Sequence, residues 1–163
     1  CLALIRDRLH HTLRDQGYAF DGVDAVVAAQ SENPAGAARA VEMLTRWVKR
    51  DDWEHILDTY ARCVRITRDL EQTYAVDPDM LLEEEERDLF QSVQDVDREA
   101  YAGGDIDGFF QSFLPLMPEI ERFFDQVLVM AEDVQLRQNR LGLLQRIADL
   151  ADGVIDMSRL EGF

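Results

Sequence analysis

The spacing of apolar residues is the feature that most constrains this fold, because they recur every three or four positions in one segment after another. The clearest run is made of Leu136, Leu143, Ile147, Leu150 and Val154. Positions three and four apart lie on one side of an α-helix, so the run predicts a helix with one buried side. No useful length of sequence alternates with a period of two, so we expect no β-strands. The sequence predicts an all-α protein.

Glycines and prolines divide this pattern into separate helices. Gly17 and the pair at 103–104 are placed to end helices, and Pro78 ends another. Pro118 is placed to begin a helix after a break near Leu114. The expected helices span residues 2–16, 23–29, 35–49, 53–74, 83–101, 106–114, 118–127 and 134–155, with a turn at Asp21-Gly22.

These helices predict an antiparallel bundle of five or six helices with a short N-terminal helical appendage. We place the joint at Ser31–Pro34, between a helical connector, residues 1–32, and the bundle, residues 33–163. The chain begins without Met, inside a helical pattern, so we interpret residues 1–32 as the tail of a missing upstream domain. No apolar run approaches the roughly 20 residues of a membrane span, and the two cysteines, Cys1 and Cys63, suit a reduced cytoplasmic protein without membrane partners.

The charge is unevenly distributed, and it limits where a nucleic acid can bind. The chain has a net charge of −16, and residues 77–125 hold fifteen acidic residues against three arginines, a net charge of −12. RNA phosphates should avoid this region except where a base is being read. Consecutive side chains of the run Glu83–Glu86 would point about 100° apart around a helix, so they cannot converge on one metal ion. The run instead suits the solvated start of a helix. We expect no metal ion and no catalytic residues.

Two groups of basic residues are candidates for RNA contact. Arg62 and Arg65 share one side of a predicted helix, and Arg46 and Lys49 lie on the helix before it. Each group is either a solvated face or a set of phosphate contacts. Both interpretations stay open from the residues alone.

The third group lies at the start of the last predicted helix. Arg137, Asn139 and Arg140 follow the acid Asp133 within two turns. These side chains either contact RNA or tie the polar joint at residues 131–133 to its neighbours through ion pairs and capping bonds. This choice also stays open.

The last third of the chain resembles a known family. The matching positions are Phe123-Phe124-Asp125, Val127 to Met130, Glu132-Asp133, Leu136-Arg137, Asn139 to Leu141 and Leu143-Leu144. This string is similar to the C-terminal DALR-type anticodon-binding domain of the bacterial glycyl-tRNA synthetase beta subunit. The similarity continues more thinly upstream, through Arg62 and Ile66, whereas Ala61 and Arg65 stand where the family carries Lys and Asn.

The resemblance implies a helical domain that binds the anticodon of a glycine tRNA and leaves catalysis to other parts of the enzyme. The intact ligase uses ATP, and the partners implied are tRNA, the alpha subunit and the rest of the beta subunit, with neither DNA nor a membrane. Glycine anticodons end in two cytosines, and a cytosine edge needs an acceptor for its amino group and donors for its ring acceptors. The expected tRNA-binding residues are Arg137, Asn139, Arg140, Arg62, Arg65, Arg46, Lys49 and Asp133. On this hypothesis Arg140→Ala weakens tRNA binding by about 1 to 3 kcal/mol.

Two alternatives remain. One is a helical interaction or scaffold module that binds no RNA, and the other is the equivalent domain of an arginyl-tRNA synthetase. Basic residues that converge on one surface favour RNA binding, and basic residues scattered among acids favour the scaffold.

Overall fold

The computed structural model describes all 163 residues, and it is all-α, as the sequence predicts. The α-helices are α1 (Leu2–Asp15), α2 (Phe20–Gln30), α3 (Pro34–Val48), α4 (Trp53–Thr67), α5 (Glu84–Gln94), α6 (Ile106–Phe113), α7 (Met117–Gln126) and α8 (Val134–Asp149). Short 3-10 segments, η1 to η4, span Pro78–Met80, Arg98–Tyr101, Leu114–Leu116 and Met157–Arg159. None of these helices has the length and apolar content needed to cross a membrane.

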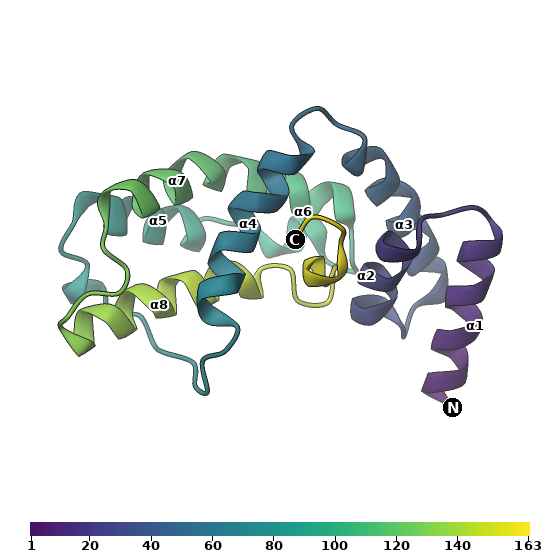
Figure 1. Ribbon diagram of the computed structural model, residues 1–163, viewed down its shortest axis with the longest axis horizontal. Helices are drawn as coiled ribbons and strands as arrows, with labels where there is room; N and C mark the ends of the chain where they lie inside the picture. The colour runs from purple at the N-terminus through teal and green to yellow at the C-terminus, as the bar shows by residue number, and fades with distance from the viewer.

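The helices form an elongated body with α1 at one end and α5, α7 and the start of α8 at the other (Figure 1). Helix α4 runs steeply between the two halves and packs against α8, while α2 packs on α3 and α5 on α7. A single cluster of 40 buried residues runs from Leu13 to Leu160, so one core serves both halves. Aromatic rings fill its centre, where Trp53, Phe110 and neighbouring rings meet edge to face.

The first thirty residues attach to this core unequally. Helix α1 buries only Leu13, whereas α2 contributes Val23 and three neighbouring side chains to the shared core. The backbone N–H of Asp156 donates to the carbonyl of Ala25 over 2.9 Å, which joins α2 to the C-terminal segment. At the expected joint, Asn33 caps α3 through a bond from the Gly36 N–H, and Pro34 begins the helix.

The helix end at Gly17 is confirmed, but Pro78 does not end a helix, because α4 already ends at Thr67 and Pro78 instead begins η1. Gly17 lies at φ 92° after α1, and Gly103 and Gly104 lie at φ 74° and 84° between η2 and α6. These values belong to the left-handed region, which only glycine adopts freely. The break near Leu114 is also confirmed, because α6 ends at Phe113 and α7 begins at Met117 with Pro118 in its first turn.

The predicted helix over 53–74 is too long, because α4 ends at Thr67. Residues 68–77 are irregular, and side chains of α8 hold their backbone. The amide oxygen of Gln145 accepts the Tyr74 N–H over 2.9 Å, and its amide nitrogen donates to the Gln72 carbonyl over 2.9 Å. These bonds replace the helical ladder, so the segment satisfies its polar groups without being a helix.

Three further boundaries differ from the prediction. The helix expected over 83–101 ends at Gln94, and the separate turn Arg98–Tyr101 follows it. Helix α8 ends at Asp149 rather than residue 155, and the expected turn at Asp21-Gly22 lies inside the first turn of α2.

At the end of α3, Val48 is 42% exposed, whereas Trp47 is buried. The indole N–H of Trp47 donates to Asp107 of α6 over 2.8 Å. This bond satisfies the indole N–H, which would otherwise be buried without a hydrogen-bond partner.

Candidate nucleic-acid interface

Helix α4 presents a row of arginines on its outer side. The Arg62 guanidinium lies 4.3 Å from the ring centroid of Phe124, in the last turn of α7, and Arg62 is half-buried. The exposed Arg65 lies 5.5 Å from the ring centroid of Phe163, and it also pairs with Asp58 over 3.3 Å. Arg68 follows at the end of the helix and is exposed. The side chains of Arg62 and Arg65 thus rest on aromatic rings while part of each remains open to solvent.

The joint before α8 is held by its own side chains. The Asp133 carboxylate accepts the backbone N–H groups of Gln135 and Leu136 over 2.9 and 3.1 Å, which caps the helix. The Arg137 guanidinium donates to the Ala131 carbonyl over 3.0 Å. Both residues therefore have the capping and tying role that the sequence left open, and the half-buried Arg137 keeps part of its surface in solvent.

Arg140 points into the protein rather than toward solvent. Its side chain is 7% exposed, and its Nε donates to Glu86 Oε1 over 2.7 Å, where the Glu86 side chain is 0% exposed. A second guanidinium nitrogen donates to the Leu128 carbonyl over 2.8 Å. Glu86 also accepts the backbone N–H of Glu83, which closes a capping box at the start of α5. The expectation that the whole Glu83–Glu86 run is solvated is wrong at Glu86.

Asn139 is also occupied within the protein. It is 3% exposed, its amide nitrogen donates to the Asp77 carbonyl over 3.1 Å, and its amide oxygen accepts the Asp77 N–H over 2.6 Å. This pair of bonds fixes the irregular segment before η1 against α8. Asn139 and Arg140 therefore hold the frame of the candidate interface.

Arg46 and Lys49 lie apart from the other predicted residues. Arg46 is on α3 and Lys49 directly follows it, in the half of the molecule that carries α1 and α2, whereas α8 begins at the opposite end (Figure 1). Arg46 pairs with Asp107 over 3.5 Å, and Lys49 is exposed just after the helix. The predicted residues thus lie in three places, at the end of α3, on α4 and at the start of α8, so they do not converge on one surface.

Two features of this region were missed from the sequence. Leu128, Met130 and Val134 are 68%, 57% and 50% exposed around the joint. Glu86 is buried although it belongs to an acidic run. The available signal was its position, because Glu86 lies three residues before Leu89 on the inner side of α5.

The chain matches the family model described as the DALR anticodon binding domain over residues 56–155. That range runs from α4 into the segment after α8, so it includes the arginine row and the joint.

Among curated proteins, the chain is similar to a glycine–tRNA ligase beta subunit of Moorella thermoacetica, with 32% identity over 95% of this chain and 23% of that protein. It is 34% identical to a chloroplastic/mitochondrial glycine–tRNA ligase of Arabidopsis thaliana, over 96% of this chain and 15% of that protein. A glycine–tRNA ligase beta subunit of an Anaeromyxobacter species is 35% identical over 86% of this chain and 21% of that protein. The chain spans about a quarter or less of the length of these relatives.

The model match covers more than half of the chain, and its ends fall within the single core described above. The chain belongs to the DALR anticodon binding domain family.

Proposed function

We propose that this domain recognises the anticodon of a glycine tRNA as part of a glycine–tRNA ligase beta subunit. The observation that carries the proposal is the family match over residues 56–155, together with the names of the relatives. In this setting the domain contributes no catalytic residue. Glycine is activated with ATP elsewhere in the ligase, and the alpha subunit and the rest of the beta subunit are its partners in the cytoplasm.

The arginine row of α4 is the best-formed surface for RNA. A guanidinium group is flat and always charged, so Arg62 and Arg65 can rest one face on Phe124 and Phe163 and offer the other to a phosphate or a base. Arg68 extends the row. Contacts of this kind supply affinity and register without reading sequence.

The other predicted residues take different parts in this proposal. Arg137 contacts RNA beside the joint that Asp133 caps, while Asn139 and Arg140 keep the joint in shape from inside. Arg46 and Lys49 contact a more distant part of the tRNA backbone, because α3 lies in the other half of the molecule. The arginyl alternative is not retained, because these relatives carry glycine–tRNA ligase names.

A fluorescence anisotropy titration tests the proposal. The chain is titrated against a labelled glycine tRNA and against the same tRNA with uracils in place of its anticodon cytosines, at several salt concentrations. We expect tighter binding to the first RNA. The double variant Arg62→Gln/Arg65→Gln should bind both more weakly and show a salt slope lower by about 1 for each phosphate that the variant no longer neutralises.

Arg8→Gln is the matched control, because Arg8 is an exposed arginine of α1 outside the proposed surface. It should reproduce the wild-type curves. Equal affinity of the wild-type chain for both RNAs would refute anticodon recognition.

One observation favours a second function, a docking module for a basic protein. Leu82, Leu128 and Met130 are exposed apolar side chains, and exposed acids such as Glu84 and Glu132 follow two residues after Leu82 and Met130 in the sequence. Exposed apolar side chains near acids suit a partner with apolar and basic residues. No binding to either RNA at low salt would favour this function.

A further inference from the structure

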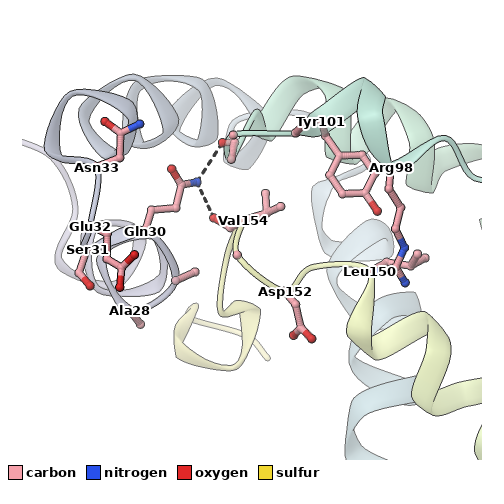
Figure 2. Close-up of a pocket in the computed structure, with 15 residues that line it drawn as sticks. Ala28, Gln30, Ser31, Glu32, Asn33, Arg98, Tyr101, Leu150, Asp152 and Val154 are labelled. Carbon is pink, nitrogen blue, oxygen red and sulfur yellow. Dashed lines mark hydrogen bonds between the residues drawn. The ribbon is translucent and has the colours of Figure 1, made fainter.

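A cleft of about 640 Å³ opens where three segments meet (Figure 2). Its walls come from the end of α2, from the turn that joins η2 to α6, and from the segment after α8. Small and aliphatic side chains line part of it, namely Ala28, Ala29, Ala102, Leu150 and Val154. The cleft is large enough for a flat six-membered ring and is distinct from the arginine row of α4.

The shape of the cleft is fixed by a buried glutamine. Gln30 is 7% exposed, and its amide nitrogen donates to the carbonyls of Gly104 and Val154 over 2.9 and 2.7 Å, as the dashed lines in Figure 2 show. A Cβ atom on Gly104 would come within 2.4 Å of the Gln30 side chain, and Gly104 lies at φ 84°. Only glycine allows this approach. One side chain thus ties all three walls together.

A buried hydroxyl at the cleft has no hydrogen-bond partner. Tyr101 is 5% exposed, and its ring packs edge to face on Phe109 with a centroid distance of 5.6 Å. Its oxygen is buried and unpaired. Burial raises the pKa of this hydroxyl, and the nearby Arg98 guanidinium lowers it, so it stays protonated and able to donate. Native proteins seldom leave such a group unpaired without a ligand or water to satisfy it.

Two opposite charges face the same cleft without pairing. Arg98 and Asp152 both line it, both are exposed, and neither forms an ion pair or a side-chain hydrogen bond within the protein. Partial burial raises the pKa of the Asp152 carboxyl, as does Asp149, while Arg98 lowers it. Both groups line the cleft, and both keep their hydrogen-bonding capacity. Arg98 offers only donors, and an ionised Asp152 offers only acceptors.

A ring with a donor beside two acceptors matches this pair. Cytosine presents its amino group next to a ring nitrogen and a carbonyl oxygen, whereas uracil presents a carbonyl oxygen in place of the amino group. That oxygen would face a carboxylate and be repelled. Glu32 also lines the cleft, so phosphates are disfavoured there and only a base is expected to enter.

We propose that this cleft binds one unpaired cytosine of the RNA, a proposal that rests on the anticodon-binding function above. Asp152 accepts the amino group, and Arg98 donates to the ring nitrogen and the carbonyl oxygen. The aliphatic walls cover the faces of the ring, and the Tyr101 hydroxyl donates a further bond. The cleft thus supplies the sequence reading that the arginine row lacks.

The test uses a labelled anticodon stem-loop with its cytosines and three copies in which one or both are replaced by uracil. The wild-type chain should prefer one particular cytosine over uracil by about 5- to 150-fold, the usual discrimination of a good bidentate contact. Asp152→Asn should abolish that preference, because an amide can donate to uracil. Arg98→Gln should weaken binding of the cytosine loop alone. Tyr101→Phe should weaken it several-fold without lowering the thermal midpoint, because the oxygen has no partner in the protein.

Asp51→Asn and Arg8→Gln are the controls, since they make the same changes of charge at exposed positions that do not line the cleft. Both should keep the preference for cytosine. A wild-type preference that survives in Asp152→Asn and Arg98→Gln would overturn the cleft assignment and leave the proposed function standing. A wild-type chain that binds all four loops equally would overturn both.

Discussion

Arg140→Ala should lower the free energy of unfolding by about 3 to 5 kcal/mol. The substitution would leave the carboxylate of Glu86, whose side chain is 0% exposed, with the Glu83 N–H as its remaining hydrogen-bond donor. It would also leave the Leu128 carbonyl without the donor that now lies 2.8 Å away. An unpaired buried carbonyl alone costs about 1 to 3 kcal/mol.

The loss is large compared with the 5 to 15 kcal/mol, roughly, that stabilises a domain. For a chain of this size it corresponds to a fall of about 6 to 20 °C in the thermal midpoint. Urea titration at pH 7, followed by far-ultraviolet circular dichroism, measures the free energy directly. The comparison requires equal slopes for the two proteins.

A double variant shows whether the effect comes from the ion pair. Glu86→Leu together with Arg140→Met buries no charge, so it should be more stable than the sum of the single losses predicts. A loss below about 1 kcal/mol for Arg140→Ala, or strictly additive single losses, would refute the reasoning from burial.

RNA titration then separates the two roles considered for Arg140. A direct contact would weaken binding by about 1 to 3 kcal/mol even in folded protein. The structural role predicts nearly unchanged affinity at temperatures where the variant is fully folded.

Two further predictions concern the core. Burial raises the pKa of the Cys63 thiol to about 12, whereas Cys1 is exposed. An aromatic disulfide reagent at pH 8 should therefore titrate one thiol per chain in buffer, that of Cys1, and two thiols in urea. Two reactive thiols in buffer would contradict the burial of Cys63. Gly142→Ala should destabilise the protein by about 1 to 3 kcal/mol, because the new Cβ would lie 2.6 Å from the Tyr74 carbonyl oxygen. The matched variant Gly22→Ala, in the first turn of α2, meets only an ordinary 3.5 Å contact with Leu44 of α3 and should be neutral or stabilising. Equal urea midpoints for both variants would refute the packing argument.

Local signals predicted the fold class and many of the helix ends. Gly17, Pro34 and Pro118 act on the backbone beside them, so their effects are visible in a short stretch of sequence. The end of α4 was not visible in this way. Leu70 and Tyr74 keep helical spacing and are partly buried, but the groups that hold their segment, Gln145 among them, lie more than seventy residues later.

The same distinction explains the candidate site. The cap of α8 by Asp133 and the bond from Arg137 to the Ala131 carbonyl are local, and the sequence indicated them as one of two roles. The partner of Arg140 is 54 residues away, and no local pattern pairs it with Glu86. The cleft escaped prediction for a similar reason, because the residues that line it, Arg98 and Asp152 among them, come from segments far apart in the sequence.

The arginine row also bears on the entropy of association. A free arginine side chain loses about 2 kcal/mol of rotamer freedom when it is fixed by a ligand. Arg62 and Arg65 are already restricted by the rings of Phe124 and Phe163. Much of that ordering is therefore complete in the unbound domain, and a polynucleotide would meet a pre-organised surface whose affinity falls if either ring is replaced by an aliphatic side chain.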